Sequence, residues 1–253
     1  MSLGLISRII GAAYRIPLNR FFGPEIMGMY QMAYPLFQLL VILSIFGFPT
    51  ALARLVAREK GTGRNKKAHD YFISAFILLG GTGAFISVLL YLGSDYYANQ
   101  VANTPDIGLA IELLSPAVFF VFLITAFRGF SQGMQNMLPF ASFQVVEQVI
   151  KVIFALFFGF MLIEALPAIT LAGIMLGTTI GAFCGLLMMA YYYFIFINRE
   201  YSNVSLESLS LGKFKKNIRD TTNICTADYP RQYNDALDAD YRCCPCYPQA
   251  GTN

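Results

Sequence analysis

Residues Leu138–Ile163 read LPFASFQVVEQVIKVIFALFFGFMLI, and this stretch decides the fold class. A helix needs roughly 20 mostly apolar residues to cross about 30 Å of hydrocarbon, and this stretch supplies that length with few interruptions. Its four strongly polar residues stand at positions i, i+3, i+4 and i+7: Gln144, Glu147, Gln148 and Lys151. Such positions share one face of an α-helix. The sequence therefore predicts a membrane-spanning helix with one polar face.

The polar face carries two ionisable groups deep in the predicted span. With a rise of about 1.5 Å per residue, Glu147 lies about 14 Å from Leu138, near the middle of the bilayer. A charged side chain there costs on the order of 3 kcal/mol or more. One interpretation is a self-neutralising pair between Glu147 and Lys151, and the other is a polar cavity. We favour the cavity because Gln144 and Gln148 extend the polar stripe beyond the pair.

The composition of the whole chain also indicates a membrane environment. Of its 253 residues 56% are hydrophobic and 13% are charged, and the mean hydropathy is +0.54. The charged share is about half of that in soluble domains, too little to coat a globule of this size. We therefore predict an all-α integral membrane protein whose residues 1–198 form a six-transmembrane-helix bundle. The spans are residues 1–22, 26–53, 71–93, 107–127, 138–163 and 168–197.

Basic residues between the predicted spans indicate the orientation. The loop between the second and third spans carries six of them: Arg54, Arg58, Lys60, Arg64, Lys66 and Lys67. The loop Ser94–Asp106 carries none. Because cytoplasmic loops are enriched in Lys and Arg, both termini and the basic loop are expected in the cytoplasm, with residues 199–216 as a basic cytoplasmic linker. Binding of anionic membrane lipids is a secondary interpretation of the basic loop.

Two arginines lie in the first predicted span. Arg8 and Arg15 are seven residues apart, so they share a helical face. One interpretation is that the Arg15 side chain extends to the outer surface of the membrane. Arg8 is about 21 Å from Phe22 along a helix, too far for its side chain to reach that surface easily. A deep guanidinium facing a cavity suits an anionic cargo such as phosphate or pyrophosphate, which it bonds bidentately.

Other chemistry is not indicated. His69 is the only histidine, and we expect it to be solvated in the basic loop. A Ser/His/Asp triad cannot be assembled around it, and the cysteine run near the C-terminus lacks the partners of a zinc or redox motif. We expect no enzymatic activity, no cofactor, no metal site and no nucleic-acid partner.

Four segments resemble one transporter family. They are SRIIGAAYRIPLNRFFGPEIMG at Ser7–Gly28, MYQMAYP at Met29–Pro35, SIFGFPTALARLVARE at Ser44–Glu59 and RGFSQGMQNMLPFASFQVVEQVIKV at Arg128–Val152. These resemble stage V sporulation protein B-type polysaccharide biosynthesis transporters. That family belongs to the superfamily that includes lipid II flippases and multidrug and toxin extrusion transporters. The resemblance covers about residues 1–216.

The resemblance implies two six-helix lobes around a central cavity and alternating access between them. It implies flipping of lipid-linked cell-wall or polysaccharide precursors, such as a lipid II-like or undecaprenyl-linked glycan, across the bacterial cytoplasmic membrane. Arg8 matches the cargo-binding arginine of the flippase motif. Tyr14 and Val41–Ile42 stand where further charges are expected, which leaves the cargo open. Six spans correspond to the first lobe, so we expect a fragment that needs the C-terminal lobe, or less favourably a homodimer, for transport.

Two other functions remain open. In a drug/cation antiporter of the multidrug and toxin extrusion type, Glu147 would carry a proton or sodium ion, although Arg8 and Arg15 disfavour a cationic cargo. A non-transporting sporulation or wall-assembly scaffold would instead use the basic loop to recruit enzymes.

The last 37 residues differ from the rest of the chain. Residues 1–216 carry all 23 phenylalanines, whereas residues 217–253 carry four of the five cysteines and have an acidic balance. One interpretation is a disordered cytoplasmic tail. We favour a frameshift, because a one-base shift in a back-translation of Pro230–Gln249 permits the apolar string LGNTMMPLMLIIDAARVIPR, which resembles the family's seventh helix. The DNA sequence decides between them.

Overall fold

The computed structural model describes residues 11, 13–45, 47–162 and 166–200. Apart from short connections these residues are helical, and none of them forms a strand. The longer helices are α2 (Arg15–Ile45), α3 (Phe48–Gly61), α4 (Asn65–Leu92), α6 (Gly108–Gly133), α7 (Leu138–Met161) and α8 (Pro167–Glu200). Three short helical turns, α5 (Ser94–Tyr96), η1 (Tyr97–Val101) and η2 (Pro105–Ile107), connect α4 to α6. The predicted all-α architecture is confirmed.

Five helical segments of the described part are long and apolar enough to cross a membrane. They are Ile16–Gly61, Asn65–Leu92, Pro105–Gly133, Leu138–Met161 and Pro167–Ile195. Half of the predicted first span 1–22, namely residues 1–10 and 12, lies outside the described residues. Large apolar side chains such as Phe85, Leu92 and Phe157 are exposed on the outside of the bundle. A surface of this kind suits hydrocarbon and not water.

Glycine and proline set the helix boundaries near the N-terminus. Gly23 has φ 77° and kinks α2 directly before Pro24. Gly47 has φ 79°, and Pro49 occupies the first turn of α3. The predicted second span, residues 26–53, is therefore not one continuous helix, because α2 ends at Ile45 and a new helix begins at Phe48.

The predicted basic loop also differs from the structure. Its first part belongs to α3 and its last part to α4, so only the turn at residues 62–64 is not helical. Gly63, with φ 71°, makes this turn possible. The six basic residues thus lie on a helical hairpin and not on a long loop.

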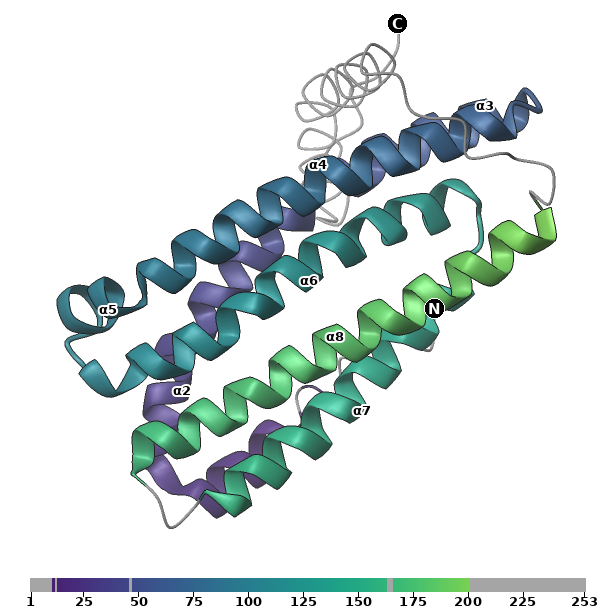
Figure 1. Cartoon of the computed structure of the whole chain (residues 1–253). Coiled ribbons are helices and arrows are strands. Elements are labelled where there is room, and N and C mark those ends of the chain that lie inside the picture. Colours follow the sequence, from purple (N-terminus) through teal and green to yellow (C-terminus); the bar gives the residue numbers. More distant parts are fainter. Residues whose placement is uncertain (1–10, 12, 46, 163–165, 201–253) are drawn as a thin grey trace, which may run out of the picture.

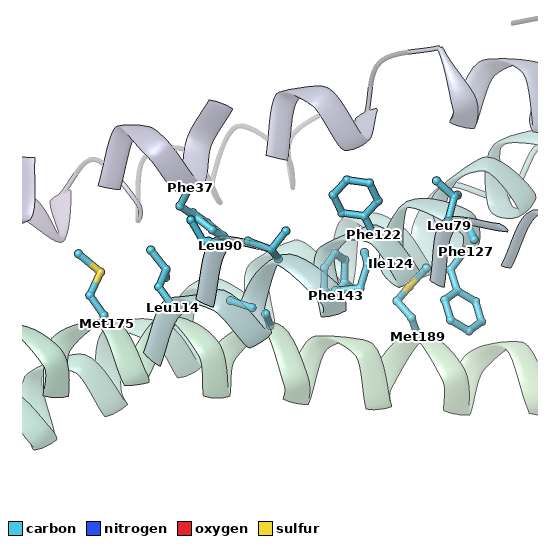
Figure 2. Close-up of a cluster of buried hydrophobic side chains, with 14 of the residues drawn as sticks. Phe37, Leu79, Leu90, Leu114, Phe122, Ile124, Phe127, Phe143, Met175 and Met189 are labelled. Atoms are coloured by element: carbon cyan, nitrogen blue, oxygen red, sulfur yellow. The ribbon is translucent and has the colours of Figure 1, made fainter. Parts of the chain in front are cut away.

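The long helices pack side by side into a bundle (Figure 1). Helix α6 lies between α4 and α8, and α7 packs along the other side of α8. Helix α3 packs against α6 and α4, while α2 crosses the bundle and contacts α6 and α8. Figure 2 shows the buried core, to which five helices contribute Phe37, Leu79, Leu90, Leu114, Phe122, Ile124, Phe127, Phe143, Met175 and Met189.

A row of glycines brings α8 close to α7. The row has one glycine every fourth residue: Gly173, Gly177, Gly181 and Gly185. A Cβ on Gly177 would overlap the Ala155 backbone, and one on Gly181 would lie 3.1 Å from the Cβ of Lys151. Small residues at this spacing allow membrane helices to approach closely. The glycine row therefore positions the α7 segment that carries the polar stripe.

Candidate functional site

A cavity of about 180 Å³ lies between α2, α6 and α7. All four stripe residues of α7 line it: Gln144, Glu147, Gln148 and Lys151. Helix α2 adds Tyr34 and Gln38, α6 adds Thr125 and Arg128, and α8 adds Thr178. The structure thus brings a polar face, predicted from spacing alone, together with polar groups from three other helices.

Lys151 is buried in the wall of this cavity. Its side chain is 6% exposed, and its Nζ donates a hydrogen bond of 3.0 Å to the Tyr34 hydroxyl. Nζ also lies 4.5 Å from the centroid of the Tyr34 ring and 6.0 Å from that of Tyr14. Aromatic faces attract cations within about 6 Å. The ammonium therefore lies beside the Tyr34 hydroxyl and near the rings of Tyr34 and Tyr14, which belong to the N-terminal part of the chain.

Glu147 does not neutralise Lys151 directly. Among the ion pairs within 4.0 Å that join described residues, none links these two side chains. The Tyr34 hydroxyl that accepts from Lys151 also accepts from Gln38 Nε2 at 2.6 Å, and the Tyr34 ring stacks on Tyr30 at 5.0 Å. A buried charge without a close partner of opposite charge is costly. The arrangement leaves the ammonium able to attract an anion.

Arg128 is a second cation of the cavity wall. Its Cζ lies 4.9 Å from the centroid of the Phe140 ring. Its Nε is buried and has no hydrogen-bond partner among the described residues. The predicted fourth span stops at Phe127, whereas α6 continues to Gly133 and places Arg128 inside the helix. Arg128 is therefore a cavity residue that the predicted span boundary excluded, although Gly133 is a sequence signal for a later helix end.

The two predicted arginines of the first span are only partly placed. Arg8 lies outside the described residues, and the structure describes the backbone but not the side chain of Arg15. Their neighbours approach the polar stripe. A Cβ on Gly11 would lie 3.3 Å from Gln148 Oε1, and Tyr14 contributes its ring near Lys151.

Comparison with known proteins identifies the family. Residues 1–230 match the family model described as polysaccharide biosynthesis protein. The chain belongs to the polysaccharide biosynthesis protein family. The matched range reaches into residues 217–253, which lie outside the described part of the structure.

Two curated relatives of this family member come from Bacillus subtilis (strain 168). Stage V sporulation protein B is 29% identical over 152 residues, which are 60% of this chain and 29% of that protein. The lipid II flippase MurJ is 28% identical over 199 residues, 74% of this chain and 37% of that protein. The matches thus cover only about a third of the length of either relative.

Solved structures show the same fold. A MOP superfamily transporter from Pyrococcus furiosus aligns with a TM-score of 0.70 at 15% identity, over 93% of this chain and 52% of that one. A MATE transporter in complex with MaD3S aligns with a TM-score of 0.68 at 16% identity, over 89% and 50%. The polysaccharide biosynthesis family member therefore has the fold of about half of such a transporter, in agreement with the predicted lobe.

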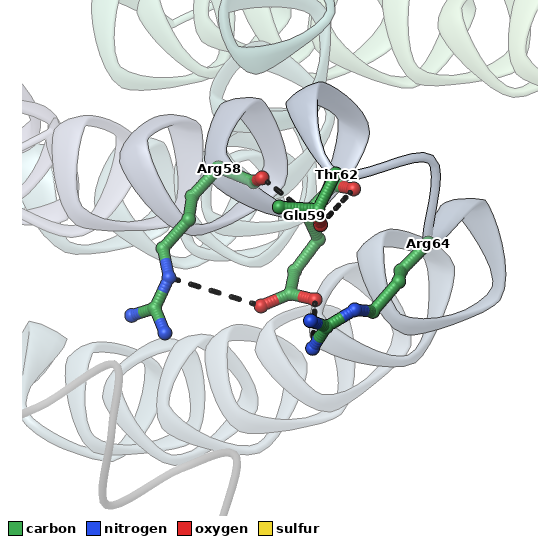
Figure 3. Close-up of polar contacts among 4 residues, drawn as sticks. All are labelled: Arg58, Glu59, Thr62 and Arg64. Atoms are coloured by element: carbon green, nitrogen blue, oxygen red, sulfur yellow. Dashed lines mark hydrogen bonds and ion pairs between the residues drawn. The ribbon is translucent and has the colours of Figure 1, made fainter.

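The predicted basic residues cluster at the turn between α3 and α4 (Figure 3). Glu59 is buried, and its carboxylate faces Arg58 Nε at 4.0 Å and Arg64 Nη1 at 3.9 Å. The Thr62 hydroxyl donates to the Glu59 carbonyl at 3.0 Å. Lys60 Nζ donates to the Met134 carbonyl just beyond α6 at 3.4 Å. These contacts attach the basic turn to the α6 end of the bundle.

His69 corrects one prediction. It is 7% exposed within α4, and its ring stacks on that of Tyr193 with centroids 6.2 Å apart. The expectation of a solvated loop histidine was wrong because α4 begins at Asn65 and turns this residue toward α8. No group of three His, Cys, Asp or Glu side chains suited to a metal occurs among the described residues.

Proposed function

We propose that this chain forms one lobe of a flippase that moves lipid-linked, anionic cell-wall or polysaccharide precursors across the bacterial cytoplasmic membrane. The observation that carries the proposal is the cavity, in which Lys151 and Arg128 have no carboxylate within 4.0 Å among the described residues. Such cations need counter-charge in a low-dielectric environment. The phosphate groups of a lipid-linked precursor would supply it.

The remaining polar groups suit a glycan attached to that phosphate. Gln38, Gln144 and Gln148 line the cavity, and a side-chain amide both donates and accepts hydrogen bonds. Glu147 adds an acceptor for sugar hydroxyls. Arg8 and Arg15 would add positive charge from the first span, as the family resemblance implies.

Alternating access needs a second lobe that moves relative to the first. The chain spans about half of each solved transporter that it resembles. We therefore propose that the cavity described here is one wall of the complete translocation path, and that the lobe binds cargo without completing a transport cycle alone.

Cargo charge separates flipping from drug/cation antiport. Lys151 and Arg128 would repel a cationic drug, which favours the anionic precursor, whereas Glu147 is the one group of the stripe that favours the antiporter. The scaffold alternative rests on the basic hairpin and requires no cargo at all.

A binding experiment tests the proposal. The purified chain in phosphatidylcholine nanodiscs is titrated with radiolabelled undecaprenyl diphosphate, undecaprenol and the cationic dye ethidium. We expect saturable binding of the diphosphate lipid only, weakened by Lys151→Gln. Preference for ethidium would support the antiporter, and binding of neither charged probe would refute the flippase proposal for this lobe.

A further inference from the structure

The two cavity cations lie at different depths. Phe140, which contacts Arg128, precedes Lys151 by eleven residues on α7. That separation corresponds to about 16 Å along the helix axis. The two cations therefore approach the cavity from backbone positions about three turns of α7 apart. One cavity thus offers two separate positions for an anion.

The surroundings of Arg128 suit a ligand more than a structural ion pair. The guanidinium is half-buried, and no carboxylate among the described residues lies within 4.0 Å of it. The contact with Phe140 is to an aromatic ring, which accepts no conventional hydrogen bond from the donors at the edge of the guanidinium. The buried Nε has no partner in the described part of the chain. A donor desolvated in this way gains most when an anion bonds to it.

Gln144 provides a neutral partner about one helical turn from the Phe140 level. It follows Phe140 by four residues, so it stands one turn deeper on the same face of α7. Its side chain lines the cavity, and no hydrogen bond joins it to another described residue. An amide N–H directed at the cavity would complement the guanidinium without adding charge.

We propose that Arg128 and Gln144 form a second anion-binding station, which holds the diphosphate of the lipid-linked cargo at the end of the cavity near the α3–α4 hairpin. The station rests on the proposed function and deepens it. Cargo meets Arg128 and Gln144 first from the hairpin side and passes to Lys151, with Glu147 between the two cations. The prenyl chain stays in the surrounding lipid.

The alternative is that Arg128 serves packing alone, through its contact between α6 and Phe140 on α7. Binding and stability distinguish the two roles. A packing residue lowers the unfolding temperature when it is changed but leaves the cargo affinity of the folded protein unaltered. If Arg128 binds the anion, its replacement lowers the affinity for the cargo. Replacement of Gln144, which has no ring contact to lose, then lowers this affinity as well.

The experiment uses the full chain in phosphatidylcholine nanodiscs, with radiolabelled undecaprenyl diphosphate as probe and inorganic pyrophosphate as competitor. We expect Arg128→Gln to weaken binding about tenfold or more, the loss typical of a charge-assisted hydrogen bond. Arg128→Lys keeps the charge but loses the planar set of guanidinium N–H donors, so it should weaken binding by about threefold. Arg20→Gln, at an exposed arginine of α2 that does not line the cavity, is the matched control and should bind as the wild type does.

The outcomes separate this station from the proposed function. Wild-type affinity in folded Arg128→Gln, together with loss of binding in Lys151→Gln, would overturn the station and leave the flippase proposal intact. If neither variant changes the affinity, both proposals fail. If Arg128→Gln does not fold, Gln144→Met decides. It keeps the side-chain length without the amide, and unchanged binding in that variant would overturn the station.

Discussion

Lys151 on α7 and Tyr34 on α2 are joined by a hydrogen bond of 3.0 Å across 117 positions of the sequence. The ammonium also lies over the Tyr34 ring, and Gln38 donates to the same hydroxyl. This contact links the two helices that face each other across the cavity. It gives the buried ammonium an oxygen and an aromatic ring as neighbours but no opposite charge, so the need for a counter-ion remains.

We expect Tyr34→Phe to destabilise the lobe. The substitution keeps the ring but removes the oxygen that accepts from Lys151 and Gln38, which leaves donors unsatisfied in a buried site. The free energy of unfolding should fall by about 1–3 kcal/mol, measured by denaturant unfolding in detergent micelles. Tyr91→Phe, at a tyrosine that is 52% exposed, controls for loss of a hydroxyl. Equal stability of the two variants would contradict the structural role of the bond.

The glycine row of α8 makes a separate prediction about packing. Gly177→Leu places a large side chain where the Ala155 backbone already lies, so α7 and α8 must separate. We expect a loss of at least about 2 kcal/mol of stability, measured in the same unfolding assay. Gly81→Leu is the matched control, since a Cβ there meets nothing within 4 Å. If both leucine variants were equally stable, close approach of α7 and α8 would not be needed.

The polar face of α7 could be predicted because the periodicity of an α-helix depends only on residue spacing within that helix. Residues at i, i+3, i+4 and i+7 point the same way whatever surrounds them, and the cavity formed on that side. The break between α2 and α3 also has local sequence signals, Gly47 and Pro49. The apolar composition on both sides of it nevertheless indicated one long span. Apolar composition records burial or lipid contact and is insensitive to a short interruption.

Contacts between distant segments could not be predicted in this way. The partner of Lys151 is on a helix more than a hundred residues earlier, and no spacing rule connects them. Arg128 falls between two predicted spans because the apolar run 107–127 ends just before it, yet α6 extends beyond it. His69 likewise precedes the predicted span 71–93, whereas α4 begins at Asn65 and includes it. Apolar patterns thus do not show that polar residues beside an apolar run belong to the first or last turns of a membrane helix.

The orientation in the membrane remains a prediction from the distribution of basic residues. Thr62 is exposed at the α3–α4 turn, and Asn103 is exposed at the other end of α4, in the connection to α6 (Figure 1). Because Lys and Arg are retained on the cytoplasmic side, the turn should lie in the cytoplasm and Asn103 outside.

Single cysteines at these two positions, in a background with the native cysteines replaced, test the orientation by labelling with a membrane-impermeant maleimide. In intact cells Asn103→Cys should react, and Thr62→Cys should react only after permeabilisation. The same assay bears on the cavity, because Arg128 lies on the hairpin side of α6 and the anion station would then open toward the compartment where lipid-linked precursors are assembled. Labelling of Thr62→Cys in intact cells would reverse the orientation, and the proposed order of cargo contacts would have to run from Lys151 to Arg128.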